Sequence, residues 1–486
     1  MCRYSASLLL VLVCCLHVRE GRCGGPVDAP DWRAGVAVAV ITPEQPMMLA
    51  GFASRREPAE GTASELHAKA VAVEDAEGTR LVIVAVDLIG IPRPLRERVE
   101  TRVWEQFDLP REGLLLNASH TYCGPELQMT DTDLEEISEE RREQTTEYCR
   151  RLEETLVELI GDALDGLQPA RLEYSHARAG FAMNRRLKNP DPDGDPYLNH
   201  PNPDGPVDHH VPVLQVLGED GSRRAILFGY ACHNTTLFIN EYAGDYAGYA
   251  QGFLEREHPG VTAVFVTGCG GDQNGFPRGT VELSRRHGRT LATAVEAALQ
   301  NRQRVVRGPL RLGYDHVTLD YQEAPTREQL EATAEGRADA PFRSFELTAA
   351  HAQRLLRQLD REGRLAESYD CPVQTVQFGD DLILVALSGE VVVDYSLRLK
   401  RELAGEAAVW VSGYNNDVFA YVPSRRVLEE GGYEPRRSMN YYTTTLHPGP
   451  FAVSIEDRIV ARVLALLGKA AAAPGDSSAA HQSRSN

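Results

Sequence analysis

Cysteine is scarce in this chain and follows no pairing pattern. Nine cysteines occur among 486 residues, and four of them lie within the first 23. The five that remain are widely spaced: Cys123, Cys149, Cys232, Cys269 and Cys371. An odd, sparse set does not make a disulfide framework, and the lack of a Cys-x-x-Cys pair argues against a thiolate zinc knuckle. We therefore expect neither a disulfide framework nor a thiolate zinc site in the mature chain.

Positive charge is also in deficit. Lys and Arg number 51 against 70 Asp and Glu, which gives a formal net charge of −19. Such a charge repels a phosphate backbone and an anionic membrane surface alike. Nucleic acid is therefore not an expected partner. Because 42% of the residues are hydrophobic, the chain can still bury a large core.

Long apolar runs are missing as well. The run at residues 8–16 is too short to span a bilayer of about 30 Å, and no later segment qualifies. Arg3 precedes this run and polar, Gly-rich sequence follows it, which is the layout of a secretory signal peptide. We expect residues 1–23 to be removed on export, leaving a secreted or periplasmic protein with no transmembrane segment. A lipid anchor on Cys14, Cys15 or Cys23 stays open.

Two familiar hydrolase signatures are absent. The chain has no Gly-x-Ser-x-Gly elbow, so it lacks the nucleophile signature of an α/β-hydrolase. It also has no His-Glu-x-x-His helix, which would fix two zinc ligands on one helical face. Any catalytic centre must be assembled from residues far apart in the sequence.

The pattern of apolar residues predicts an α/β fold. Short runs rich in Val, Ile and Leu are typical of buried strands; they lie at 35–41, 81–86, 113–116, 225–230, 261–266, 382–387 and 407–411. Helical periodicity appears at 148–167 and 347–365. No linker divides the chain, so we expect a single large domain over residues 30–469, with mixed β-sheets flanked by helices, followed by a disordered Ala/Ser-rich tail at 470–486.

Several of these predicted strands end in residues that can do chemistry. His120, His233 and Glu390 each follow such a run. Ligands bind at the carboxyl ends of strands in open α/β sheets, where distant segments can meet. A single polar residue at a strand end, or a single buried histidine, is ordinarily structural. Two histidines and a glutamate in the same position favour a zinc site, since catalytic zinc commonly takes three protein ligands and keeps one position open.

A set of motifs in a fixed order resembles the neutral/alkaline non-lysosomal ceramidase family, in its N-terminal catalytic domain. The clearest is Asn-Ala-Ser-His-Thr-Tyr-Cys-Gly-Pro at residues 117–125, which is similar to the family's His-Thr-His-Ser-Gly-Pro segment. The other matching segments are 47–53, 66–70, 86–88, 184–185, 231–235, 244–250, 388–390, 416–421 and 433–434. Tyr421 and Tyr433 keep the family's separation of twelve residues. The resemblance extends over nearly the whole mature chain.

The resemblance implies a zinc ion held by His120, His233, Glu390 and Tyr421. It also places Arg185 and Tyr433 beside the substrate carbonyl, where they would donate hydrogen bonds to the tetrahedral oxyanion. Zinc would lower the pKa of a bound water to about 7 and polarise the carbonyl.

Two positions depart from the family pattern. Tyr122 replaces the second histidine of His-Thr-His, and Asn274 replaces the serine in the segment that begins at Gly271-Asp272. Tyr122 could still donate a hydrogen bond, and Asp272 is retained. Asn274 cannot be an acyl nucleophile. We therefore expect direct attack by zinc-activated water, with Asn274 as a positioning residue.

The implied function is hydrolysis of an N-acyl amide bond by a zinc-dependent enzyme, with a ceramide-like lipid as the substrate class. Two alternatives stay open. The same chemistry could act on a small non-lipid amide or a related bond. The chain could also be an inactive, zinc-bearing binding protein, because both departures lie at the proposed site.

The leader prediction has a direct test. If residues 1–23 are a signal peptide, the mature protein starts after them and is found outside the cytoplasm. Sequencing the N-terminus of the protein purified from its producing cells measures this. Recovery of intact Met1 in the cytoplasm would show that the leader is not cleaved.

Overall fold

The computed structural model describes residues 31–52, 54–127, 137–337, 347–442 and 445–469. The predicted leader at 1–23 and the predicted tail at 470–486 lie outside the described residues, so both remain predictions. None of the helices in the described part of the chain is long and apolar enough to cross a membrane.

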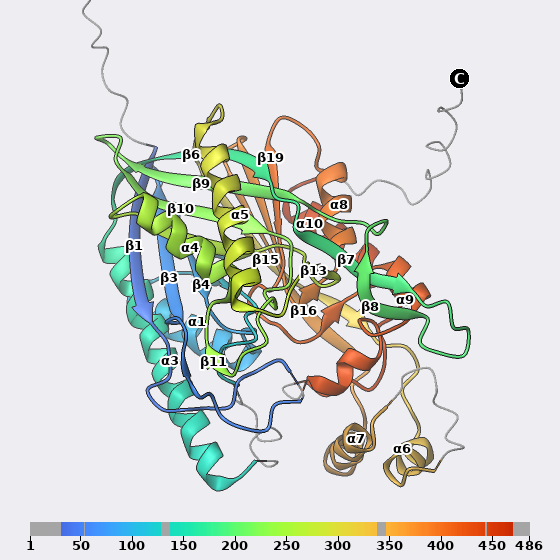
Figure 1. Ribbon diagram of the computed structural model, residues 1–486. Coiled ribbons are helices and arrows are strands. Elements are labelled where there is room, and N and C mark those ends of the chain that lie inside the picture. Colours follow the sequence, from blue (N-terminus) through green and yellow to red (C-terminus); the bar gives the residue numbers. More distant parts are fainter. Residues whose placement is uncertain (1–30, 53, 128–136, 338–346, 443–444, 470–486) are drawn as a thin grey trace, which may run out of the picture.

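The larger of two main sheets forms the left half of the view in Figure 1. Its strand order is β12-β10-β9-β6-β1-β3-β4-β5, and β14 also pairs with β6. The strands are β1 (Trp32–Val40), β3 (His67–Asp75), β4 (Arg80–Val86), β5 (Leu114–Ala118), β6 (Gln168–Arg178), β9 (His210–Gly218), β10 (Arg223–Tyr230), β12 (Thr262–Thr267) and β14 (Arg304–Val306). The pairs β4/β5 and β10/β12 are parallel, whereas the others are antiparallel.

The second sheet has the order β15-β16-β17-β19. Its strands are β15 (Leu310–Asp320), β16 (Ser368–Phe378), β17 (Leu382–Leu387) and β19 (Ala408–Ser412), and β17 pairs with β19 in parallel. Three small sheets join loops near the carboxyl ends of the parallel strands: β2 (Gly61–Thr62) with β11 (Glu241–Tyr242), β13 (Gln273–Gly275) with β7 (Ala182–Lys188) and β8 (Tyr197–Asn202), and β18 (Glu390–Val391) with β20 (Tyr421–Val422).

The two main sheets pack face to face between layers of helices. Alternate residues of a strand point to opposite faces. In β4, for example, Leu81 and Ile83 join an apolar core that also holds Leu384 of the second sheet, whereas Val82 and Val84 pack toward helices. The outer layers are α1 (Arg93–Phe107), α3 (Glu139–Asp165), α4 (Asp245–Glu257) and α5 (Val281–Gln300) on the larger sheet, and α8 (Val393–Glu402) and α10 (Ile455–Leu466) on the smaller one.

The remaining helices lie at the periphery. α6 (Arg327–Ala334) and α7 (Ala349–Glu362) pair at the lower right of Figure 1. α9 (Arg425–Glu430) and two 3₁₀ turns, η1 (Arg111–Gly113) and η2 (Arg437–Tyr441), complete the described elements.

The predicted fold class, α/β with mixed sheets flanked by helices, is confirmed. Each of the seven predicted strands and both predicted helices corresponds to an observed element. The first helix begins at Glu139, nine residues before the apolar periodicity starts, because the Ser138 side chain accepts a hydrogen bond from Arg141 N and caps the helix. The first two turns contain only charged and polar residues, so apolar spacing gave no sign of them.

Candidate metal centre

The two main sheets meet at the carboxyl ends of their parallel strands, and the candidate site lies there. His120 follows β5, His233 follows β10 and Glu390 follows β17. Isolated bridges tie the neighbouring loops together, pairing Asn117 with Asn415 and His233 with Asn274. Residues more than 250 positions apart in the sequence therefore share one rigid framework.

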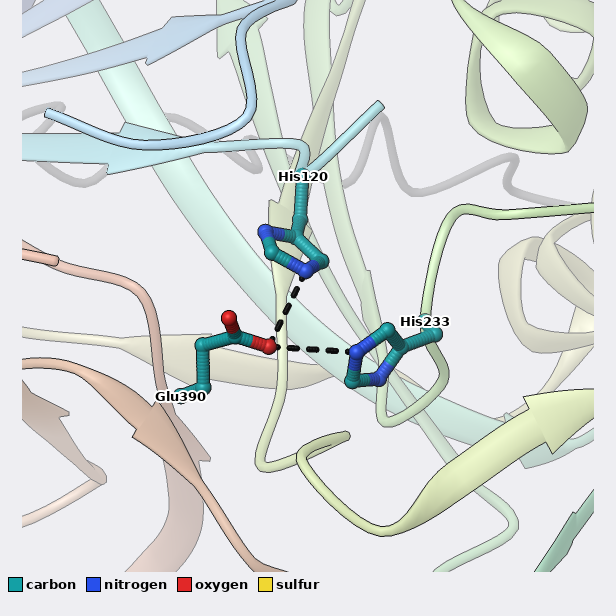
Figure 2. Close-up of side chains that lie close together, drawn as sticks. All are labelled: His120, His233 and Glu390. Atoms are coloured by element: carbon teal, nitrogen blue, oxygen red, sulfur yellow. Dashed lines mark ion pairs between the residues drawn. The ribbon is translucent and has the colours of Figure 1, made fainter. Parts of the chain in front are cut away.

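Three buried side chains point toward one another in this framework (Figure 2). Glu390 Oε2 lies 3.0 Å from His120 Nε2 and 3.1 Å from His233 Nε2. One ligand atom from each residue lies within 4.8 Å of the others. Three of the four residues that the family resemblance implied as ligands, His120, His233 and Glu390, are thus brought together.

Backbone carbonyls fix the orientation of both imidazoles. His120 Nδ1 lies 2.6 Å from Ile89 O, and His233 Nδ1 lies 2.7 Å from Gly270 O. A carbonyl accepts a hydrogen bond, so each Nδ1 carries a proton, and in the neutral form of each ring Nε2 then presents a lone pair. Metal-binding histidines are commonly held in this way.

The facing atoms are therefore all acceptors. His120 Nε2 and Glu390 Oε2 have no hydrogen-bond partner among the described residues, although both are buried. An unpartnered buried polar atom is costly, and lone pairs that face one another repel. One proton could satisfy one of these contacts but not both. A cation among the three atoms removes the whole conflict.

The electrostatics keep the imidazole of His233 neutral. Burial, and then the charge of Arg185, lower the pKa of His233 to about 4. Burial alone would raise the pKa of Glu390, but the positive charge and the N–H that His120 or His233 presents when protonated hold that pKa well below its usual range. A neutral imidazole and an ionised carboxylate are the forms that bind a metal.

The backbone at His120 is strained. Its φ is +61°, in the left-handed region that residues with a Cβ rarely adopt. Strain of this kind costs of order 1–3 kcal/mol and tends to occur at functional sites. Here it turns the chain sharply after β5, so that the imidazole faces Glu390.

Tyr421 lies beside the three candidate ligands. Glu390 and Tyr421 are register partners in the parallel pair β18/β20, so their side chains share one face. The phenol oxygen is 3.1 Å from His233 Nε2 and accepts a hydrogen bond of 3.0 Å from Arg185 Nη2. Burial raises the pKa of Tyr421 well above its ordinary value, so the hydroxyl keeps its proton.

Arg185 is fixed from several sides. Its Nη1 lies 3.2 Å from His233 Nε2, and its Nε donates to Glu434 Oε1 at 2.9 Å. Glu434 also accepts from Arg186, so one buried carboxylate binds two buried guanidinium groups. Burial would lower the pKa of Arg185, but Tyr421 and Glu434 more than offset it and the group stays charged.

These side chains form the floor of a cavity of about 520 Å³. Three of the predicted catalytic residues, Arg185, Tyr433 and Tyr122, line it. The Tyr122 ring centroid lies 5.3 Å from that of His120, and the Tyr433 ring lies 5.7 Å from that of Tyr421. The rest of the wall is mainly apolar or aromatic, including Phe52, Ile89, Pro92, Leu127, Val418, Tyr441 and Tyr442.

Two of the predicted catalytic residues lie behind this wall. Asn274 is fully buried, with Oδ1 3.4 Å from Arg185 Nη1 and Nδ2 3.2 Å from Asn199 Oδ1. The Asp272 carboxylate accepts from Val393 N at 2.8 Å and Asn184 Nδ2 at 3.0 Å, and its carbonyl accepts from Arg185 N. Burial raises the pKa of Asp272 to about 6. Both residues therefore contact Arg185 rather than the cavity.

The structure adds residues that the sequence did not single out. Tyr442 donates a hydrogen bond to Glu390 Oε1, and so occupies the carboxylate oxygen that does not face the histidines. Glu434 anchors Arg185. Glu434 was visible as the neighbour of Tyr433, whereas no spacing rule connects Tyr442 with Glu390, 52 residues away.

Comparison with known proteins identifies the family. The family model for the N-terminal domain of neutral/alkaline non-lysosomal ceramidases matches residues 32–329. This chain belongs to that family, which confirms the resemblance seen in the sequence. Comparison with curated proteins gives no match.

Solved structures share the fold. The crystal structure of neutral ceramidase from Pseudomonas aeruginosa superposes with a TM-score of 0.65 at 22% identity, covering 92% of this chain and 77% of that one. A structure of a ceramidase complexed with C2 gives the same TM-score and identity, with 93% and 78% covered.

The double pairing of Glu434 predicts a measurable stability effect. Glu434→Gln removes one charge from between two buried arginines, and we expect a loss of about 3 kcal/mol in the free energy of unfolding at pH 7. The arginines lower the folded-state pKa of Glu434 below its ordinary value of 4.5, against the effect of burial. The stabilisation is therefore full above pH 4.5 and is lost as the pH falls toward the folded pKa.

Denaturant unfolding at several pH values measures this difference. Glu74→Gln is the matched control, since it breaks a pair with Arg33 of 2.7 Å whose arginine side chain is 51% exposed. It should cost less than about 1 kcal/mol. A Glu434→Gln loss as small as that of the control, or one that does not begin to shrink as the pH falls below 4.5, would contradict the assigned role.

Proposed function

We propose that this chain is a zinc-dependent hydrolase of an N-acyl amide bond, with a ceramide-like lipid as the substrate class. Family membership supports an amidohydrolase. The observation that carries the proposal is the convergence of three buried, lone-pair-bearing atoms on one point beneath a cavity.

The ligand chemistry suits zinc. Two imidazole nitrogens and one carboxylate oxygen, from His120, His233 and Glu390, are a common catalytic zinc set. Calcium and magnesium prefer oxygen ligands. Tyr421 would be the fourth protein ligand. When bound there, zinc would activate a water molecule and polarise the amide carbonyl.

The other residues around this centre would bind and orient the substrate. Arg185 keeps a fixed charge beside the metal site, and Tyr433 contributes a hydroxyl to the cavity wall. Both could donate to the carbonyl oxygen as it becomes an oxyanion, and fixed donors cost little reorganisation. In the net reaction the C–N bond breaks, the oxygen of water joins the acyl carbon, and the amine takes up a proton.

The cavity wall supports an amphiphilic substrate. Its floor is polar, whereas much of its wall is apolar, so a lipid amide could place its scissile bond on the floor and its chain along the wall. The structurally similar ceramidase complexed with C2 is consistent with this class. A panel of N-acyl lipids and small N-acyl compounds, with free amine as readout, separates a lipid substrate from a non-lipid one. No turnover by the zinc-loaded protein would favour the binding-protein alternative.

The ligand assignment predicts the metal content. Purified protein should contain about one zinc per chain, and His120→Ala or His233→Ala should lose most of it, because each removes one of three strong ligands. Elemental analysis on folded protein measures this. His258→Ala is the control, since His258 pairs with Glu296 on the surface. Full zinc content in both ligand variants would show that the metal, if any, lies elsewhere.

The mechanism predicts a graded set of activity losses. Tyr433→Phe or Arg185→Gln should lower kcat by about 10²- to 10³-fold, the usual scale for one oxyanion donor. Asn274→Ala should cost less, because it removes only the hydrogen bonds that Asn274 makes with Arg185 and Asn199. Glu390→Ala should cost more than any of these. Tyr249→Phe on α4 is a control outside the cavity and should keep full activity.

Turnover and zinc content are measured together for each variant. Two results would refute direct attack by water: a trapped covalent acyl-enzyme, or an Asn274→Ala variant that keeps its zinc and is as inactive as Glu390→Ala.

A further inference from the structure

One charged residue of the cavity wall has no role in the chemistry described so far. Arg278 follows β13 and lines the same cavity as His233 and Glu390. Its Nη1 donates to the carbonyl oxygen and to the hydroxyl of Thr235, both at 3.3 Å. Thr235 also lines the cavity and lies two residues after His233. The guanidinium therefore lies close to the candidate metal centre.

The charge of Arg278 is not balanced as other charges in this wall are. Arg185 pairs with Glu434 at 2.9 Å, and Glu126 pairs with Arg141. In the part of the chain that the structure describes, the hydrogen bonds of Arg278 go to Thr235 alone, and no carboxylate oxygen lies within 4.0 Å of it.

The carboxylate of Asp245, which lies farther from Arg278, does not serve as its counter-ion. Burial and then the charge of Arg185 lower the pKa of Arg278, and the opposing effect of Asp245 is smaller. The Asp245 oxygens already accept hydrogen bonds from Thr236 N, Leu237 N and Ser284 Oγ at 2.8–2.9 Å. Arg278 is thus a partly buried cation beside a second cation, and its remaining N–H groups are available to a ligand.

Aromatic rings continue from Arg278 toward the metal centre. The guanidinium carbon lies 5.4 Å from the ring centroid of Phe238, which is 53% exposed. Phe238 packs edge-on against Phe52 at 5.1 Å, and Phe52 against Tyr122 at 4.9 Å. This row of three rings gives an apolar track from the surface to the ring that contacts His120.

We propose that the substrate of this site carries an anionic group near its scissile amide and that Arg278 binds this group. The inference rests on the proposed amide hydrolysis. It refines the substrate class from an uncharged ceramide to an anionic N-acyl amphiphile, such as an N-acyl amino acid or a phosphorylated N-acyl amine. A partly buried cation without a counter-ion is costly, and guanidinium binds carboxylate or phosphate through paired hydrogen bonds.

Three substrates with one acyl chain test the proposal. N-lauroylglycine, N-lauroyl-O-phosphoethanolamine and N-lauroylethanolamine carry a carboxylate, a phosphate and a neutral hydroxyl. The better of the two anionic substrates should have a kcat/KM about 10- to 100-fold above that of N-lauroylethanolamine. The difference should lie mainly in KM, because the neutral substrate cannot form the charge-assisted hydrogen bond. The better of the two identifies the anionic group as carboxylate or phosphate.

Variants assign the preference to Arg278. Arg278→Gln should abolish the preference and leave turnover of N-lauroylethanolamine within about threefold, whereas Arg278→Lys should keep part of it. Arg289→Gln is the matched control, since Arg289 also lies over a phenylalanine ring, Phe253, but outside this cavity. Equal turnover of all three substrates by the wild-type chain, or an equal loss on all three in Arg278→Gln, would overturn the proposal.

A binding measurement separates this inference from the catalytic one. Calorimetric titration of the full chain, zinc-loaded and after chelation, should show N-lauroylglycine or its phosphate counterpart binding about tenfold more tightly than N-lauroylethanolamine. Arg278→Gln should remove that difference. If no substrate is hydrolysed, the proposed function fails while binding still decides the role of Arg278. If neutral amides are hydrolysed and bound as well as anionic ones, the proposed function stands and this inference fails.

Discussion

Repulsion among three buried lone pairs is the constraint on which the rest of this site depends. Carbonyls of Ile89 and Gly270 hold the two imidazoles so that their Nε2 atoms face the same oxygen of Glu390. Folding alone would not favour this arrangement, since it leaves acceptors unpartnered and strains the backbone at His120. A divalent cation would turn the facing acceptors into ligand atoms, and that gain would offset the backbone strain. The arrangement is thus best understood as a site built for a metal.

The surrounding structure keeps this centre rigid. Tyr442 binds the second oxygen of Glu390, and the β18/β20 pair sets Tyr421 beside it. Glu434 holds Arg185 through a buried ion pair, while Asn274 and the Asp272 carbonyl contact the same arginine from behind. Groups fixed before the substrate arrives need little reorganisation during the reaction. Arg278 differs from them, because it lines the cavity with no carboxylate paired to it among the described residues and donates hydrogen bonds to Thr235 alone.

Much of the framework could be predicted from the sequence. Buried strands have an apolar pattern, and β4, β5, β10 and β17 were therefore predicted from residues such as Leu81 and Leu384. Because polar residues end these strands, strand direction indicated that His120, His233 and Glu390 could meet, and the family resemblance implied them as ligands. Three kinds of feature could not be predicted. The solvated start of α3 has no apolar period, Tyr442 reaches Glu390 through a tertiary contact, and the placement of Asp272 behind the wall depends on the turn before β13.

The central claim is that two imidazoles and at least one oxygen ligand bind zinc at this point. X-ray absorption at the zinc edge of the purified protein tests it most directly. The account predicts a first shell of nitrogen and oxygen at about 2.0–2.2 Å, with the outer-shell scattering of two imidazole rings, and its loss in His120→Ala. A shell with sulfur near about 2.3 Å, or one with no imidazole scattering, would contradict it.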